Sequence, residues 1–247
     1  MQIAGSTRSL WDLPFPAACS QLQDLGFDKV EIWVSSQFEQ LTPAQIINDT
    51  DSVLASFRDA SRLSPVAIFV DDPLSSDEFG KVVQFAKSLR IGQITVPASP
   101  LGTPFNSEID RLREYNHQCI EEGIRLSILT RTGLLTEDPH TATELCQSVK
   151  GLGVTLDPTY YVHTPRGEID FDVVYPHVSH VQLRDSSATE VQVPAGLGNV
   201  DYNRIISSLR NEDYDRTLSV DLLPRTMTGE ERLLELRKLR LLLESLL

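Results

Sequence analysis

The sequence reads HVQLRDS at residues 180–186, where polar and aliphatic side chains alternate along one predicted strand. The side chains of a strand alternate between its two faces, so Val181 and Leu183 face away from Gln182. Three further runs alternate in the same way and end in polar residues: LSILTRTG (126–133), VTLDPTYY (154–161) and LSVDLL (218–223). Such strands, aliphatic on one face and polar on the other, are expected in a barrel wrapped in helices.

The remainder of the chain continues this alternation of strands and helices. Expected strands are 1–6, 28–35, 65–71, 92–98, 124–130, 152–157, 178–184 and 216–223. Expected helices are 15–26, 43–61, 75–89, 107–122, 139–150, 167–175, 201–211 and 229–246. Regular alternation predicts parallel strands joined by right-handed crossovers. The pattern therefore predicts an α/β protein with one domain, residues 1–247, folded as a single (β/α)8 TIM barrel.

An open doubly wound sheet is the alternative fold. That fold is typically marked by a glycine-rich turn after its first strand. The residues here are Gly5-Ser6-Thr7-Arg8, which do not form that motif. The closed barrel is therefore the preferred interpretation.

The acidic net charge of the chain indicates which kinds of molecule it is expected to bind. The chain has 22 Lys and Arg residues against 35 Asp and Glu residues, a formal charge of −13. Nucleic-acid binding depends on neutralising phosphates with basic side chains, so this balance argues against it. No apolar run reaches the roughly 20 residues that a membrane helix needs. The first residues, Met1–Gly5, are expected to form a strand and not a signal peptide. We expect a cytoplasmic protein that binds a small molecule and forms a homodimer.

The alternation of side chains along each strand (the strand phase) also predicts which polar side chains point into the barrel. They are Glu31, Asp157, His180, Gln182, Arg184 and Asp221. Arg131 shares the phase of Leu129 and lies just beyond it, and Trp33 is expected at the mouth as a packing residue or a sugar contact. Unpaired charges inside a barrel are costly, so these groups must bind a metal, pair with each other or reach water.

The ordered motifs resemble the xylose isomerase-like barrels, a superfamily of sugar isomerases, ketose 3-epimerases, inosose dehydratases and endonuclease IV. The segments that carry the resemblance are GFDKVEIWV (26–34), LSILTRTG, LDPTYY, HVQLRDS, GLGNVDY (196–202) and SVDLL. The resemblance implies one divalent metal, held by four side chains on strands five to eight. An enzyme of this kind abstracts a proton next to a carbonyl that the metal polarises.

The implied metal positions are only partly filled by suitable ligands. They fall on Leu129, Asp157, Gln182 and Asp221, and the position of an additional histidine is Tyr160. Leucine cannot bind a metal, and a glutamine amide is a poor ligand for zinc or manganese. His163 and His180 are the alternative ligands. We therefore expect no tightly bound cofactor, and at most a weakly bound Mn, Mg or Zn ion at Asp157, Gln182 and Asp221.

Two arginines are expected to supply the positive charge that a metal ion would otherwise provide. Arg131 and Arg184 either neutralise Asp157 and Asp221 or receive a carboxylate or phosphate through a two-pronged contact. The glycines of Gly196-Leu197-Gly198 form either an ordinary loop capped by Asp185 or a phosphate cradle before the next helix.

Two functions follow from these residues. The first is a sugar or polyol isomerase or epimerase with an incomplete metal site, in which Asp221 and Glu31 are catalytic. Its substrate-binding residues are Arg131, His180, Gln182, Arg184 and Trp33. The second is a non-catalytic barrel, a pseudoenzyme that binds a sugar or sugar acid. DNA repair is disfavoured by the acidic charge and by the absence of histidine from strands three and four.

Overall fold

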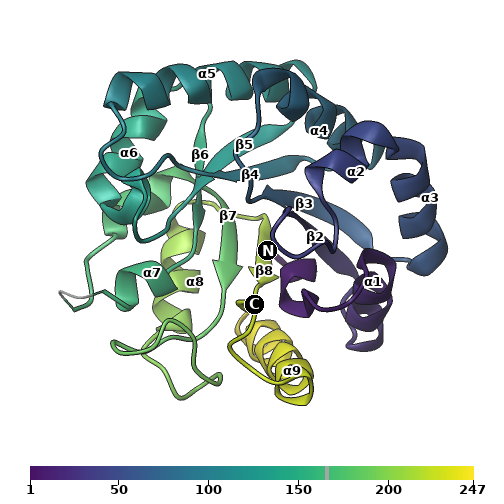
Figure 1. The fold of residues 1–247 in the computed structure, drawn as a ribbon. Coiled ribbons are helices and arrows are strands. Elements are labelled where there is room, and N and C mark those ends of the chain that lie inside the picture. The colour runs from purple at the N-terminus through teal and green to yellow at the C-terminus, as the bar shows by residue number, and fades with distance from the viewer. Residues whose placement is uncertain (165–166) are drawn as a thin grey trace.

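The computed structural model describes residues 1–164 and 167–247, and within them eight parallel strands close into a barrel (Figure 1). The strands are β1 (Gln2–Ser6), β2 (Lys29–Val34), β3 (Ser64–Val70), β4 (Gln93–Pro97), β5 (Arg125–Leu129), β6 (Gly153–Leu156), β7 (Val178–Leu183) and β8 (Thr217–Val220). Each strand pairs with the next one along the chain, and β8 pairs with β1. The predicted (β/α)8 TIM barrel is confirmed.

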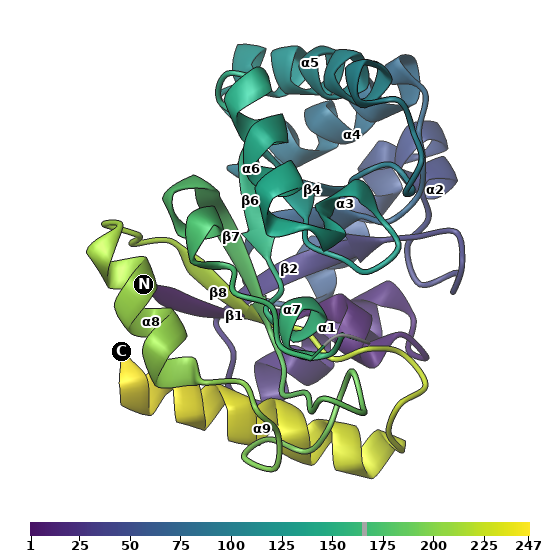
Figure 2. The ribbon, with the colours of Figure 1, turned by 90° about the vertical axis from the view of Figure 1, so that its left-hand side faces the viewer.

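Helices surround the barrel on its outer face. They are α1 (Phe15–Asp24), α2 (Pro43–Asn48), α3 (Thr50–Ala60), α4 (Ser76–Ser88), α5 (Phe105–Glu121), α6 (Pro139–Ser148), α7 (Thr159–Val162), α8 (Tyr202–Asn211) and α9 (Gly229–Leu246). Short 3-10 turns add Thr7–Leu10, Leu135–Glu137 and Asp172–His177. Figure 2 shows α8 and α9 beside each other on the side of the barrel opposite α4 and α5. None of the described helices is long and apolar enough to cross a bilayer.

Side chains at the helix starts explain where several helices begin. Ser75 accepts a hydrogen bond from the backbone of Glu78, whose side chain bonds back to the backbone of Ser75. Thr228 and Glu231 repeat this reciprocal capping at the start of α9. Each such cap satisfies backbone N–H groups that have no partner within the helix.

Two predicted helices differ from the structure. The expected helix 43–61 is divided at Asp49, whose backbone (φ −148°, ψ 56°) is not helical and whose side chain caps α3 instead. The expected helix 167–175 is wrong, because a 3-10 turn over Asp172–His177 takes its place and contains Pro176. Proline lacks the N–H that a regular helix needs, so the turn stays short.

The two faces of the strands agree with the predicted alternation. The aliphatic residues Val154, Leu156, Val181 and Leu183 are fully buried in the core between strands and helices. The inner face is polar even at mid-barrel, as shown by a cluster of hydroxyl groups from three adjacent strands. Ser127 Oγ lies 2.6 Å from Thr155 Oγ1, which lies 2.8 Å from Thr95 Oγ1. The hydroxyl groups of β4, β5 and β6 are thus hydrogen-bonded to one another inside the barrel.

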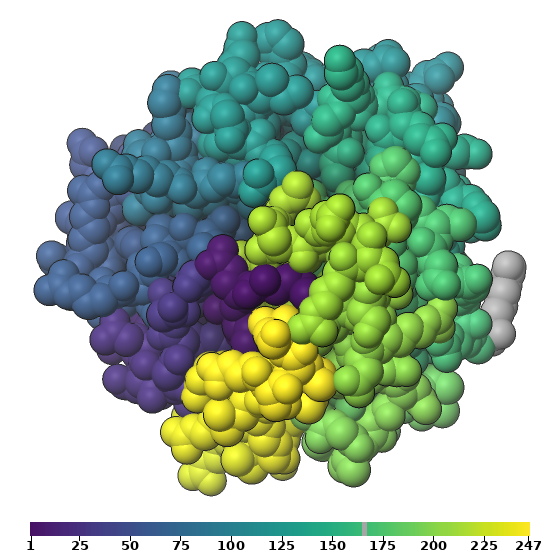
Figure 3. All heavy atoms as spheres, turned by 180° about the vertical axis from the view of Figure 1, so that it is seen from behind, coloured from purple at the N-terminus to yellow at the C-terminus, as the bar shows by residue number. Residues whose placement is uncertain are grey.

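Both chain ends lie on the face where the strands begin. Figure 3 shows this face, with the first residues of the chain next to the last helix near its middle. The opposite face carries the carboxyl ends of the strands, which is where TIM-barrel sites are built. We call this second face the mouth.

Candidate functional site

Two carboxylates at the mouth are completely buried against one arginine. Asp157 follows β6, Asp221 follows β8, and neither side chain is exposed to solvent. Arg184 Nη1 lies 2.6 Å from Asp157 Oδ2 and 3.6 Å from Asp221 Oδ2. Asp157 also accepts hydrogen bonds from the backbone N–H and the hydroxyl of Thr159, the first residue of α7. These contacts agree with the expectation that Arg184 neutralises both carboxylates.

A second arginine, Arg8, completes the charged cluster and was missed from the sequence. It lies in the 3-10 turn after β1, where its Nε donates to Asp221 Oδ1 at 3.0 Å and its Nη2 pairs with Oδ2. Burial alone would lower the pKa of Arg8, but the Asp221 carboxylate raises it above its ordinary value. Arg8 lies two residues after the end of β1, and Arg184 lies one residue after the end of β7. This similar position just past a strand was the available signal.

The charged cluster is neutralised internally but not fully hydrogen-bonded. Burial raises the pKa of the Asp157 carboxyl, and the charge of Arg184 works against that rise. Arg184 Nε and Nη2 are buried without a hydrogen-bond partner among the described residues. The guanidinium carbon lies 5.1 Å from the centre of the Tyr160 ring, a cation–π contact. Two arginines thus balance two carboxylates in a place closed to water.

The other half of the mouth is apolar. Leu129 packs with Trp33 and Phe69 in a small buried cluster, and all three are essentially inaccessible to solvent. Trp11 and Phe38 cover this cluster from the loops that follow β1 and β2. Arg8 crosses between the two halves, with its guanidinium 5.1 Å from the Phe69 ring. Leu129 is therefore a packing residue of this apolar half.

Three predicted site residues form a separate cluster deeper in the barrel. Gln182 Nε2 donates to Glu31 Oε1 at 2.9 Å, and His180 Nε2 lies 3.3 Å from the same oxygen. His180 also contacts Ser219 Oγ at 3.1 Å. A register shift of β2 against β3 between Val30 and Glu31 accompanies this cluster. Glu31 and Gln182 are therefore hydrogen-bonded to each other in the interior, while Glu31 Oε2 and Gln182 Oε1 have no described partner.

These residues do not fit a divalent metal. Guanidinium groups already occupy the carboxylates of Asp157 and Asp221, and the amide nitrogen of Gln182 is directed to Glu31. The fourth implied position is the hydrocarbon side chain of Leu129. Within residues 1–164 and 167–247, no group of three or more His, Cys, Asp or Glu side chains is arranged to hold a metal ion. A metal would have to displace one of two buried arginines.

Arg131 lies at the rim and does not join the charged cluster. Its Nη1 pairs with Asp71 Oδ1 at 2.9 Å, so the expectation that it neutralises Asp157 or Asp221 is wrong. Leu129 and Asp157 are at the ends of β5 and β6, whereas Arg131 is two residues further and extends towards β3. The pair borders a cavity of about 470 Å³ at the ends of β3, β4 and β5. The guanidinium group of Arg131 thus lies at the edge of a cavity large enough for a small molecule, where it can contact a ligand.

This cavity has an apolar lining with a few polar groups. Phe79, Tyr115 and several prolines and aliphatic residues form its walls, and Asp72 and Arg111 add charge. Burial raises the pKa of Asp72 above its ordinary value, and the neighbouring Asp71 carboxylate adds to the rise. Apolar walls with a few convergent polar groups are typical of small-molecule sites.

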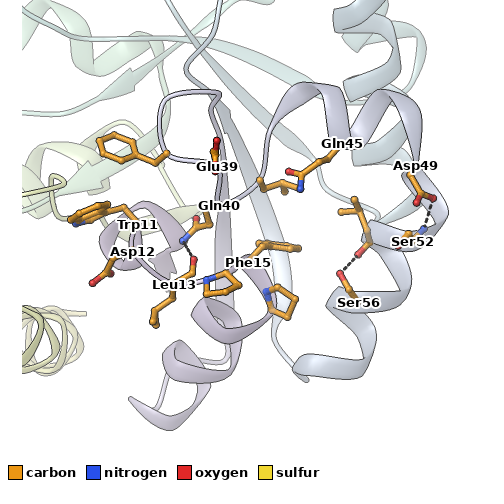
Figure 4. Close-up of a pocket in the computed structure, with 15 residues that line it drawn as sticks. Trp11, Asp12, Leu13, Phe15, Glu39, Gln40, Gln45, Asp49, Ser52 and Ser56 are labelled. Atoms are coloured by element: carbon orange, nitrogen blue, oxygen red, sulfur yellow. Dashed lines mark hydrogen bonds between the residues drawn. The ribbon is translucent and has the colours of Figure 1, made fainter.

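A second cavity, of about 670 Å³, lies beside the apolar half of the mouth (Figure 4). Trp11 and Asp12 line one side of it, and Gln45 of α2, Ser52 of α3 and Asp49 between these helices line the other. With Glu39 it carries three carboxylates and no basic side chain among its lining residues. It would repel a ligand that carries a carboxylate.

The glycine-containing loop after β7 forms an internal cap rather than a phosphate cradle. Asp185 Oδ2 accepts the backbone N–H groups of Gly196 and Gly198 at 2.8 and 3.1 Å. Asp185 Oδ1 accepts the backbone N–H of Ser186 at 2.9 Å. A side-chain carboxylate thus occupies the position where the alternative interpretation placed a phosphate, and the capped-loop interpretation is confirmed.

Comparisons with known proteins agree with this architecture. A xylose isomerase-like TIM barrel protein from Mycobacterium smegmatis, solved with magnesium, has a TM-score of 0.77 at 16% identity, covering 100% of this chain and 98% of that chain. The probable 3-DHS dehydratase AsbF from Bacillus anthracis has a TM-score of 0.74 at 17% identity, covering 97% and 98%. A D-tagatose 3-epimerase-like protein also has a TM-score of 0.74 at 17% identity, covering 100% and 98%.

At these identities the structural likeness establishes the fold alone, and no curated protein matches the sequence. The model of one family, described as the xylose isomerase-like TIM barrel, matches residues 19–241. That match covers most of the chain, from α1 to α9. The protein therefore belongs to the xylose isomerase-like TIM barrel family.

Proposed function

We propose that this chain binds a sugar or sugar acid without carrying out metal-dependent isomerisation or epimerisation. The observation that supports this most directly is the buried pairing of Arg8 and Arg184 with Asp157 and Asp221. Proton abstraction needs a carboxylate within reach of the substrate, and metal binding needs free oxygen ligands. Both carboxylates are instead held by guanidinium groups and shielded from solvent.

The ligand site in this proposal is the cavity of about 470 Å³ at the ends of β3, β4 and β5. Arg131 is its donor, because its half-exposed guanidinium can bind a hydroxyl or a carboxylate of the ligand. Asp71 and Asp72 are acceptors for ligand hydroxyl groups, and the ring of Tyr115 and the neighbouring prolines cover the apolar side of a sugar. The larger cavity is less suited to a sugar acid because its lining is acidic.

A panel of neutral sugars and sugar acids tests the proposal through the melting temperature of the full chain. A ligand of this class should raise the melting temperature of the wild type, and Arg131→Ala should remove the rise. Glu39→Gln, in the acidic cavity, is the matched control and should keep it. NMR of the same mixtures, with and without added manganese, should show the ligand unchanged.

Three results would contradict the proposal. One is the absence of any shift across the panel, and another is an equal shift in Arg131→Ala and the wild type. The third is conversion of a sugar that is lost in Asp221→Ala, which would instead favour an isomerase, epimerase or dehydratase with Asp221 in a catalytic role.

A further inference from the structure

A cavity of about 360 Å³ opens at the end of the barrel opposite the mouth, among the first residues of several strands. Its lining includes Arg90, Arg125 and Arg216. It belongs to the face shown in Figure 3, where the chain ends also lie. Three arginines around one cavity are notable in a chain with 35 acidic and only 22 basic residues.

The arginines of this cavity lack acidic partners. Among the described residues, the side chains of Arg90 and Arg125 form no ion pair or hydrogen bond, and Arg216 donates to the carbonyl of Val178 at 3.3 Å. Burial and the nearby charge of Arg216 both lower the pKa of Arg125. Asp215 also lines the cavity, but its exposed carboxylate pairs with none of the three arginines in the described part of the chain. The three guanidinium groups therefore lie around this cavity without an ion pair among the described residues, and the charge of Asp215 offsets only part of the effect of burial and of Arg216 on Arg125.

Two buried polar side chains in the lining each have an atom without a hydrogen-bond partner among the described residues. Ser179 is only 8% exposed, and its Oγ has no hydrogen-bond partner within the described residues. Gln93 is 3% exposed; its Nε2 donates to Ser127 Oγ at 2.6 Å, whereas its Oε1 has no described partner. Buried polar groups are nearly always hydrogen-bonded, so the unpaired Ser179 hydroxyl and Gln93 Oε1 in a lining with three arginines indicate a missing hydrogen-bond partner.

We propose that this cavity binds a phosphate group, with Arg125 and Arg216 as the cationic contacts and the Ser179 hydroxyl as a further donor. The forked guanidinium matches the oxygens of a phosphate, and several donors around one anion satisfy its lone pairs. Gln93 Oε1 accepts a hydrogen bond from a protonated phosphate oxygen or a bridging water. The source is either inorganic phosphate or a small phosphate monoester. This site is separate from the mouth and does not depend on the proposed function there.

Titration of the full chain with inorganic phosphate, followed by calorimetry and melting temperature, tests the proposal. Phosphate should stabilise the wild type more than chloride at equal ionic strength. Arg125→Gln should weaken phosphate binding about tenfold or more, because hydrogen bonds to charged groups contribute strongly. Arg125 makes no described contact that folding needs, so this variant should fold as the wild type does. A parallel titration with glycerol 3-phosphate distinguishes the monoester from the free ion by which of the two binds more tightly.

Arg237→Gln, on the exposed face of α9, is the matched control and should bind phosphate as the wild type does. Arg131→Ala should also bind normally, because it lies at the mouth. The proposal is overturned if phosphate binds Arg125→Gln and wild type equally, or if its effect on the wild type does not exceed that of chloride.

Discussion

The two halves of the barrel mouth are both buried, but one is filled by apolar side chains and the other by charged side chains. On the side of β2, β3 and β5, Leu129 packs with Trp33 and Phe69 as a dry apolar cluster. On the side of β1, β6, β7 and β8, two arginines and two carboxylates are buried against one another. The apolar half needs only shape complementarity. The charged half is stable only while its charges remain paired, so the two halves should respond differently to mutation.

The largest effect is expected in the charged half, for Arg184→Ala. This change leaves Asp157 buried without a counter-charge and Asp221 with Arg8 alone. Removing one partner of a buried ion pair costs about 3–5 kcal/mol. Urea unfolding should show a loss of this size in the free energy of unfolding. Arg184→Lys, which keeps the charge, should lose less, and an alanine variant within about 1 kcal/mol of the wild type would contradict the pairing.

In the apolar half, Leu129→Ala should be the most informative change. A buried leucine replaced by alanine loses about 2–5 kcal/mol, depending on how far its surroundings close the cavity. Leu129→Met keeps the volume and should cost less than about 1.5 kcal/mol. If Leu129→Ala proved neutral in urea unfolding, Leu129 would not be part of a close-packed cluster.

A third change, Asp221→Asn, keeps the shape of the charged half but removes one negative charge. Arg8 then has a neutral partner, and hydrogen bonds to charged groups contribute about 1.5–3 kcal/mol. The free energy of unfolding should fall by about 2 kcal/mol. Asp110→Asn, in a pair with Arg113 whose side chains are 77% and 59% exposed, is the matched control and should cost at most about 1 kcal/mol. Equal losses in the two variants would show that burial does not strengthen the Asp221 pair.

The smallest effect on stability is expected at the rim, for Arg131→Ala. Arg131 is 37% exposed in its pair with Asp71, and exposed pairs contribute about 0–1 kcal/mol. This small loss should shrink at high salt because solvent ions screen the pair. The loss caused by Arg184→Ala should stay nearly constant with salt, since that pair is buried. Measuring both variants at low and high salt would separate the rim from the charged half, and equal salt dependence would contradict this distinction.

Much of the barrel could be predicted from the sequence because its signals are local. Alternation along each strand placed Val181 and Leu183 outside and Gln182 inside, and capping residues marked the starts of helices such as α4 and α9. The same alternation placed Leu129 on the inward face of its strand, and the family resemblance implied that this position is one of the metal ligands. The division of the expected helix 43–61 at Asp49 was not predicted. Asp49 ends α2 and caps α3, but in the sequence it cannot be told from an exposed polar residue within one long helix.

The partners of the charged residues were decided only by the tertiary structure. Arg8 and Asp221 are 213 residues apart in the chain, and they meet because β8 closes the barrel against β1. Arg131 has the strand phase of the interior, yet it pairs with Asp71 because it extends past the end of β5 towards β3. The sequence by itself determined the eightfold alternation and which side chains point inwards, since both depend on neighbouring residues. Which carboxylate each arginine neutralises depends on barrel closure and on where each strand ends, and these are properties of the folded chain.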